Sequence, residues 1–290
     1  MHKIYTKRRF WLFVTPMFLF FLVFMVYPLI AAFVLSFTNY RGIGGITWNN
    51  FSNYARLIAD KYFWNALTNS LSCAVIMFIF IVPLSFLLAL WLNEQSKRNS
   101  IYKGIIFASY VIPGVLSALI WYFLLKPNSG LFSAVLTTIG IKSPIWIGSK
   151  SGLMSMTSVC LVRAWCHMGF YMSLWQAGLK AIPTDVLEAA ELDGCTGAKR
   201  IFKIILPIIK DNTATICIFL LTSALKIYEI VYMLTGGGPM HASETIVSYL
   251  YTTTFDGMQY GYGMTIAVAE FALAVMISIL SLSISKKNED

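Results

Sequence analysis

Four ionisable side chains interrupt long apolar segments in the second half of the sequence: Arg163, Lys226, Glu229 and Glu270. An ionisable group at bilayer depth costs about 2.5–3.5 kcal/mol on insertion scales, so it usually faces a protein interior or a water-filled path. At about 1.5 Å of rise per residue, all four lie roughly 9–15 Å below the outer ends of their segments, in one layer. Lys226 and Glu229 are three residues apart, which predicts that they share a helix face and can pair.

Aromatic residues close to these charges indicate what the layer could bind. Sugar hydroxyls need hydrogen-bonding partners and sugar ring faces are apolar, so a polar pocket with aromatic walls suits a sugar. The predicted substrate path comprises Arg163, Trp165, Lys226, Tyr228, Glu229, Tyr232 and Glu270, with Tyr171 close by. The four charges cancel, which favours a neutral oligosaccharide, although the two cations could accept an acidic sugar or a phosphate ester. The alternative is structural, with two ion pairs that hold the segments together.

The composition places these segments in a lipid bilayer. Of the 290 residues, 58% are hydrophobic and 12% are charged, whereas soluble domains have about 25% charged residues. The basic surplus of +9 is distributed in short clusters between apolar runs, which is typical of membrane proteins and not of a continuous nucleic-acid-binding face. The sequence therefore predicts an integral membrane protein that binds no nucleic acid.

The apolar runs predict six transmembrane helices, because a helix needs about 20 mostly apolar residues to cross the hydrocarbon. The predicted spans are residues 10–37, 70–92, 104–125, 152–178, 213–235 and 263–283. Strands of a membrane barrel would be about ten residues long with alternating polarity, and these runs are longer and uniformly apolar. The predicted fold is an all-α membrane protein.

The basic residues predict the orientation, since Lys and Arg favour the cytoplasmic side. With both termini in the cytoplasm, 14 of the 22 Lys and Arg residues lie inside, six lie outside and two lie within spans. The inner set is Lys3, Lys7, Arg8, Arg9, Lys97, Arg98, Lys103, Lys180, Lys199, Arg200, Lys203, Lys210, Lys286 and Lys287, and the outer set is Arg41, Arg56, Lys61, Lys126, Lys142 and Lys150.

The inner loop between the fourth and fifth spans is predicted to hold a short, capped helix. Asp185 and Glu188 form a D-x-x-E version of a capping box, and Gly194 is well placed to end the helix in a left-handed conformation. A second helical stretch is predicted to begin near Thr196 and to meet Pro207. The alternative is a helix on the membrane surface with no partner.

The same loop carries a family resemblance. Glu188, Ala189, Ala190, Asp193 and Gly194, with Leu206-Pro207 downstream, resemble the EAA motif of permease subunits of binding-protein-dependent ABC importers. Further features resemble the carbohydrate branch of these permeases, the maltose and glycerol-3-phosphate type. They are Asn53-Tyr54, Asn65 with Asn69-Ser70, Ile112-Pro113, Trp165, the segment 177–183, and Thr235-Gly-Gly-Gly-Pro239 followed by Ser243-Glu244-Thr245.

The resemblance implies a type I ABC importer transmembrane domain in a bacterial cell membrane. The loop would be a coupling helix that contacts a cytoplasmic ATPase through Glu188, Ala189, Ala190, Asp193 and Gly194. The implied partners are a homologous second permease subunit, two copies of the ATPase, and an extracellular solute-binding protein that delivers a sugar. The implied segments are residues 1–66 (N-terminus, first span and outer loop), 67–284 (importer core with coupling loop 181–207) and 285–290 (cytoplasmic tail).

Other functions find less support in the residues. The chain has no G-x-x-x-x-G-K-[ST] loop, so ATP and Mg²⁺ are expected on a partner ATPase and no cofactor is expected here. An intramembrane enzyme would need a motif such as H-E-x-x-H or a nucleophile–base pair, and five cysteines without a C-x-x-C pair predict no metal site. An ion-coupled secondary transporter or channel is the remaining alternative, but all four intramembrane charges lie in the second half, without the paired repeats typical of that class.

Overall fold

The computed structural model describes residues 7–94, 96–149 and 152–287. Its contacts group the chain into two compact units: unit 1 comprises residues 1–60 and 250–272, and unit 2 comprises residues 61–249 and 273–290. These two units are defined by contacts within the chain. The segments 1–66, 67–284 and 285–290 of the sequence analysis are defined by membrane position and by the family core. The division into those three segments therefore stays a prediction. Lys3 and Lys150, two of the basic residues behind the predicted orientation, lie outside the described residues.

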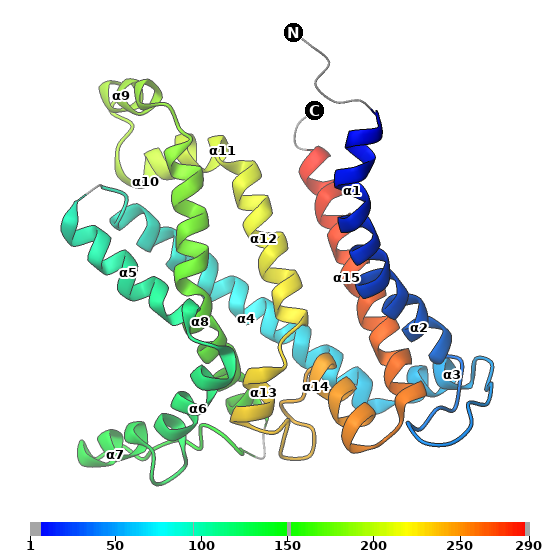
Figure 1. Ribbon diagram of the computed structural model, residues 1–290. Coiled ribbons are helices and arrows are strands. Elements are labelled where there is room, and N and C mark those ends of the chain that lie inside the picture. The colour runs from blue at the N-terminus through cyan, green and yellow to red at the C-terminus, as the bar shows by residue number, and fades with distance from the viewer. Residues whose placement is uncertain (1–6, 95, 150–151, 288–290) are drawn as a thin grey trace. The chain divides into compact units, whose positions relative to one another are not determined.

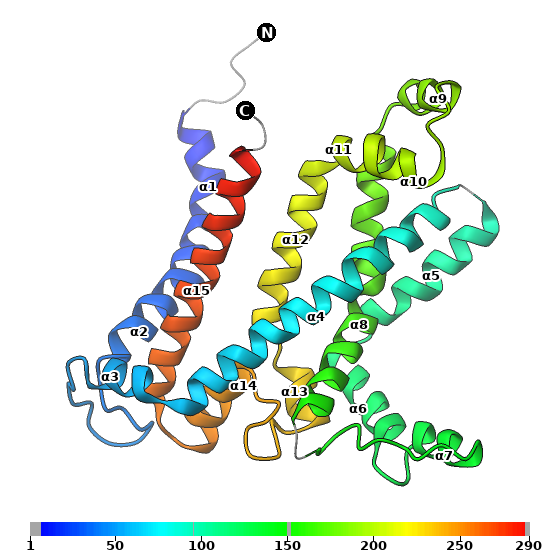
Figure 2. The ribbon, with the colours of Figure 1, turned by 180° about the vertical axis from the view of Figure 1, so that it is seen from behind.

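Helices account for nearly all the regular structure of the described residues (Figures 1 and 2). Unit 1 holds α1 (Lys7–Phe21), α2 (Tyr27–Leu35) and α3 (Ser52–Ala59). Unit 2 holds α4 (Lys61–Trp91), α5 (Lys97–Val111), α6 (Gly114–Leu125), α7 (Leu131–Thr138), α8 (Leu153–Lys180), α9 (Thr184–Leu192), α10 (Gly197–Arg200), α11 (Leu206–Ile208), α12 (Lys210–Leu225) and α13 (Glu229–Leu234). The sequences of α14 (Ile246–Tyr251) and α15 (Tyr260–Lys287) cross the boundary between units, and π-helical turns occupy Leu22–Val26, Ile201–Ile205 and Thr252–Asp256.

Four of the six predicted spans coincide with single long helical segments of the described chain: residues 10–37, 70–92, 152–178 and 263–283. Three helical segments are long and apolar enough to cross a membrane: Phe10–Leu35, Lys61–Trp91 and Tyr260–Leu280. Two bent helix pairs also qualify if each counts as one span, which gives five by length and composition. The fourth predicted span coincides with α8, whose 28 residues extend about 42 Å at 1.5 Å per residue. The apolar helices confirm a multi-pass membrane protein, and the total of six spans stays a prediction.

Two predicted spans are not single straight helices. In the segment 104–125, α5 ends at Val111 and α6 begins at Gly114, with a bend of 98° between them. Pro113 lies at this break, where it has no amide hydrogen to continue the helical ladder. In the segment 213–235, α12 ends at Leu225 and α13 begins only at Glu229.

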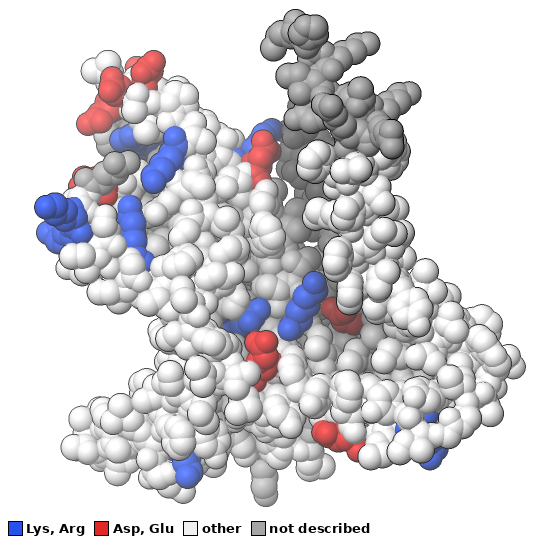
Figure 3. All heavy atoms as spheres, in the orientation of Figure 1, with Lys and Arg blue, Asp and Glu red and all other residues white. Residues whose placement is uncertain are grey.

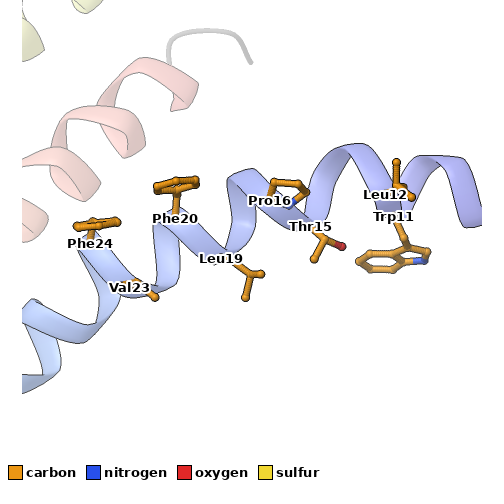
Figure 4. A pocket seen from close by; sticks show the side chains of 8 residues that line it. All are labelled: Trp11, Leu12, Thr15, Pro16, Leu19, Phe20, Val23 and Phe24. Atoms are coloured by element: carbon orange, nitrogen blue, oxygen red, sulfur yellow. The ribbon is translucent and has the colours of Figure 1, made fainter.

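Unit 1 presents an apolar groove along α1 and its π-helical continuation. Leu12, Pro16, Phe20 and Phe24 lie along one edge of it, and Trp11, Thr15, Leu19 and Val23 lie along the other (Figure 4). None of the eight side chains is charged, and the most apolar stretch of Phe10–Leu35 is 0% buried within the chain. This surface is suited to contact with lipid hydrocarbon or with another apolar helix.

The loop that follows α2 is fixed by buried polar contacts within unit 1. The side-chain amide of Asn53 donates hydrogen bonds to the carbonyl oxygens of Ser36 (2.8 Å) and Thr38 (2.9 Å). The Ser36 carbonyl also accepts from the hydroxyl of Thr265 on α15 at 3.0 Å. Buried polar groups of this kind are costly unless paired, so α3, the end of α2 and the start of α15 are held together.

Unit 2 is organised around α4 and α8, which pack against each other. Trp175 of α8 is 1% exposed, and its indole nitrogen donates to the hydroxyl of Ser85 on α4 at 3.1 Å. The helix α5 approaches the other side of α8, where a Cβ added to Gly169 would lie 2.5 Å from the Cα of Phe107. Small residues let helix backbones approach closely in membranes, and this contact requires one.

Candidate functional site

The predicted coupling helix is α9, which lies at one end of unit 2 (Figures 1 and 2). Pro183 is its N-cap residue, with an extended backbone, and the helix begins at Thr184. Asp185 therefore lies within the first turn, and no side chain caps the N-terminus of α9. The predicted capping box is wrong because the helix begins two residues earlier than that motif requires. The carboxylate of Asp185 still lies in the turn where the helix dipole favours negative charge.

The predicted end of α9 is confirmed. Gly194 has a φ of +68° and follows the C-cap residue Asp193. The amide of Gly194 donates to the carbonyl of Glu191 at 3.0 Å, and the amide of Cys195 donates to the carbonyl of Ala190 at 2.8 Å. These two bonds form a Schellman motif, and the side chains of Cys195 and Ala190, which flank it, are both buried. The C-terminus of α9 is thus fixed by its own backbone.

The faces of α9 differ in exposure. Ala190 is buried, and Leu187 packs against the hydrophobic core of unit 2. The other residues of the predicted contact set are exposed: Glu188, Ala189, Asp193 and Gly194. Acidic side chains gather on this end of the molecule in Figure 3, with basic side chains beside them. Ala190 therefore anchors the helix, while the other four residues are available to a partner.

The segment after α9 connects it to the membrane-embedded helices. Arg200 of α10 lies 3.9 Å from the carboxylate of Glu191. The chain then passes through α11, which contains Pro207, and bends by 80° after Ile208 into α12. The second helical stretch, predicted to begin near Thr196 and to meet Pro207, is confirmed by α10, the π-helical turn Ile201–Ile205 and α11. A displacement of α9 would therefore be transmitted through a short, bonded connection to α12.

The intramembrane charges are arranged differently from the prediction. Lys226 is the exposed C-cap residue of α12 and Glu229 is the first residue of α13, so they do not share a continuous helix face. Neither takes part in an ion pair within 4.0 Å among the described side chains. The predicted pairing is wrong because the helix is interrupted between the two residues. Glu270 lies on α15 in unit 1 and is half-buried.

Glu229 instead lies against Gly114, a residue that the sequence analysis missed. A Cβ added to Gly114 would be 2.5 Å from Oε2 of Glu229. Gly114 begins α6 and Glu229 begins α13, so the carboxylate lies near the first turns of two helices, where helix dipoles favour it. Arg163 of α8 is half-buried, and its Nε has no hydrogen-bond partner among the described residues.

Each of the predicted aromatic residues contacts another side chain of unit 2. Trp165, with 36% of its surface exposed, packs edge-on against Trp121 at 5.7 Å between ring centroids. Tyr228 and Tyr232 lie 5.5 Å apart, and Tyr232 is 43% exposed. Tyr171 is only 1% exposed, and its hydroxyl bonds to Ser223 of α12 at 3.1 Å, so it belongs to the core. Nothing in the sequence distinguishes Trp121 from other aromatic residues of apolar segments.

The arrangement suits binding and movement. Over the described ranges, no cluster of three His, Cys, Asp or Glu side chains could hold a metal ion. What unit 2 does combine is an exposed, capped helix at one end and charged and aromatic side chains at helix breaks within its apolar segments. Such a combination suits a transported solute and a coupled partner.

Comparisons with known proteins agree with this arrangement. Residues 81–288 match the family described as "Binding-protein-dependent transport system inner membrane component". The chain is 30% identical over 285 residues to the trehalose/maltose transport system permease protein MalF of Thermococcus litoralis, covering 97% of this chain and 94% of that protein. It is also 30% identical to the diacetylchitobiose uptake system permease protein NgcF of Streptomyces coelicolor, covering 92% and 79%.

Solved structures show the same fold. The crystal structure of a bacterial ABC transporter involved in the import of the acidic polysaccharide alginate includes a chain that matches with a TM-score of 0.84 at 22% identity, covering 97% of this chain and 96% of that one. The family match covers most of the sequence, and the relatives extend it over nearly the full length. This chain is a member of the family of inner-membrane permease components of binding-protein-dependent ABC transport systems.

Proposed function

We propose that this permease carries an oligosaccharide across a bacterial cell membrane as part of an ATP-driven importer. Support for the substrate class comes from its relatives, whose names specify trehalose/maltose, diacetylchitobiose and arabinooligosaccharides. A neutral oligosaccharide remains the first choice, because the four intramembrane charges cancel. The observation that carries the proposal is α9, an exposed acidic helix fixed at its C-terminus by a Schellman motif and bonded to the segment that leads into α12.

The proposed mechanism places ATP hydrolysis on a separate subunit. The family component is a membrane subunit without a phosphate-binding loop, so two copies of a cytoplasmic ATPase would bind ATP and Mg²⁺ and hold α9. Closure of the ATPase would move α9, and the bend at Ile209 would transmit this movement to α12. A homologous second permease subunit would complete the path, and an external solute-binding protein would deliver the sugar. A structure described with an alginate-bound periplasmic protein supports the last of these partners.

The proposed substrate path uses the breaks in the helices of unit 2. Lys226, Tyr232 and Trp165 are exposed in the single chain although their segments are apolar. Lys226 lies at the break between α12 and α13, and Trp165 lies within the unbroken α8. Helical interruptions at membrane depth are tolerated where they line a cavity or are covered by protein, so the break at Lys226 fits a path between subunits. Arg163, Tyr228 and Glu229 complete the proposed set in unit 2, and the assignment of Glu270, which belongs to unit 1, rests on the sequence alone.

A charge reversal on α9 tests the proposal. Glu188→Lys is expected to lower ATP-dependent uptake of sugar about tenfold or more, because a reversed charge at a docking surface opposes its partner and a factor of ten corresponds to about 1.4 kcal/mol. Uptake is measured in vesicles that contain the assembled transporter and the sugar-loaded binding protein. The matched control is Glu94→Lys, the same charge reversal at an exposed residue outside α9.

The outcomes separate the two functions considered. Loss of uptake in Glu188→Lys, with normal amounts of protein in the membrane and normal uptake in Glu94→Lys, supports the coupled importer. Uptake that continues without ATP and follows an ion gradient would overturn it in favour of a secondary transporter. Equal uptake by both variants would contradict the role of α9.

A further inference from the structure

A large pocket with a mixed polar and apolar lining opens in unit 2 at the end opposite α9. Its volume is about 860 Å³, and it is lined by α4, by the start of α8 and by the loop 239–242. The starts of α4 and α8 and the loop before α14 lie far from α9 in both ribbon views (Figures 1 and 2). Ligand pockets typically occupy about 300–1,000 Å³. The pocket shares no residue with the predicted substrate path.

One face of α4 supplies most of the polar lining. Tyr62, Asn65, Asn69, Ser72 and Ile76 line the pocket at alternating spacings of three and four, which places them along one side of the helix. The first four carry hydroxyl or carboxamide groups, and the last is apolar. The lining therefore changes from polar to apolar along α4, and Met156 of α8 adds to the apolar end.

The opposite wall is a loop held by hydrogen bonds to α4. The amide nitrogen of Asn65 donates to the carbonyl of His241 at 2.6 Å, and that of Asn69 donates to the carbonyls of Ala242 (3.2 Å) and Glu244 (2.9 Å). The ring of His241 also contacts the carboxylate of Glu244. These bonds fix the wall before any ligand arrives, which lowers the ordering cost of binding.

The chemistry of the lining matches a saccharide. Tyr62 and His241 form an aromatic surface, with their ring centroids 4.3 Å apart. Each carboxamide that holds the loop also carries an oxygen that can accept a hydrogen bond, and Ser72 adds a hydroxyl. Lys61, at the start of α4, also lines the pocket and adds an ammonium group that can donate to a hydroxyl. Aromatic faces combined with hydrogen-bond donors and acceptors suit the apolar ring faces and the hydroxyls of a sugar.

We propose that this pocket is a separate saccharide-binding site, which takes up a neutral di- or trisaccharide at the end of the permease remote from α9. The proposal rests on the proposed function, since it assumes that the substrate is a sugar. In the predicted orientation the pocket is on the outer side, so it would hold the sugar between its release from the binding protein and its passage into the membrane.

Filling the pocket tests the proposal. Ser72→Trp places a large side chain in the cavity, and Leu71→Trp places the same side chain at the neighbouring exposed position, which does not line it. Binding of maltose, diacetylchitobiose and arabinotriose to the assembled transporter in nanodiscs is measured by saturation-transfer NMR at about 10 mM sugar without binding protein. A signal from at least one sugar is expected for the unchanged protein and for Leu71→Trp, and a clearly weaker signal is expected for Ser72→Trp, in which only the substrate path remains open. A second variant, Tyr62→Ala, is expected to weaken binding about three- to tenfold through loss of one aromatic contact.

The outcomes also distinguish a saccharide from other occupants of the pocket, and they distinguish a failure of this proposal from a failure of the proposed function. No sugar signal from the unchanged protein, or equal signals from Ser72→Trp and Leu71→Trp, would overturn the site. Ser72→Trp could instead abolish the stimulation of ATP hydrolysis by the loaded binding protein while sugar binding persists. In that case the pocket is a docking site for the binding protein, and the proposal is wrong. Absence of ATP-driven uptake of any of the three sugars by the unchanged transporter would count against the oligosaccharide importer itself.

Discussion

Gly194 has a backbone conformation that determines which residues it can be replaced by. Its φ is +68°, and a Cβ added to it would meet no atom within 4 Å. The requirement is therefore conformational and not steric. A left-handed conformation costs an L-residue with a side chain roughly 1–2 kcal/mol, and asparagine is among the residues that adopt it more readily. Replacement of Gly194 can thus loosen α9 without disturbing any neighbouring side chain.

Gly194→Ala is expected to uncouple ATP hydrolysis from transport, while Gly194→Asn is expected to retain most of the coupling. Both variants add a Cβ, but asparagine tolerates the left-handed conformation better, so the Schellman hydrogen bonds persist. The measurement is the amount of sugar imported per ATP hydrolysed by the reconstituted transporter. Equal ratios for the two variants would show that backbone conformation at this position does not control coupling.

Some of the site residues could be predicted from the sequence and others could not. Gly194 was predictable because a glycine that follows a helical pattern carries its own local signal. The position of Glu229 was not, because its neighbour Gly114 is far away in the sequence and becomes its contact only when α6 and α13 pack together. The buried contact of Tyr171 was not predictable for a related reason: a tyrosine in an apolar segment has the same sequence pattern whether it lines a path or bonds to a hydroxyl such as that of Ser223.

The helices show where hydropathy is informative and where it is not. Apolar runs located α4 and α15 well, since length and composition suffice to identify a long apolar helix. The same measure cannot detect the interruption between α12 and α13, because Lys226-Ile227-Tyr228 is too short to change the mean of a long window. The bend between α5 and α6 had a visible cause in Pro113, but its angle of 98° depends on the contacts of α6 with α7 and α13.

The contact of α5 with α8 gives a second prediction. Gly169→Ala is expected to destabilise the transporter by about 1–3 kcal/mol, because the added methyl group meets backbone atoms of Ile106 and Phe107 that cannot turn aside. Gly104→Ala on α5 is the control, since nothing lies within 4 Å of its added Cβ. Thermal unfolding of the detergent-purified transporter measures the difference. A midpoint for Gly169→Ala as high as that of Gly104→Ala would show that α5 and α8 are less close than the structure has them.

The orientation of the whole molecule in the membrane is open to a direct experiment on unit 2. Its two ends each present one highly exposed apolar side chain, Leu192 at the end of α9 (90%) and Met240 in the loop before α14 (94%). The distribution of Lys and Arg predicts that the first is cytoplasmic and the second is external. A cysteine at each position would therefore be accessible from opposite sides of the membrane.

Intact cells treated with a membrane-impermeant maleimide are expected to label Met240→Cys at once and Leu192→Cys only after permeabilisation. The native thiols give little background, since Cys73, Cys160, Cys166 and Cys195 are buried and Cys217 is half-buried, and burial keeps a thiol unreactive. Both positions are exposed in the single chain, so a failure of one to react even after permeabilisation indicates that a partner subunit covers it. The reverse pattern, with Leu192→Cys labelled from outside, would place α9 beyond the reach of any cytoplasmic ATPase. The same result would place the proposed saccharide pocket on the inner side of the membrane. One labelling experiment therefore decides on which side of the membrane the coupling helix and the proposed saccharide site lie.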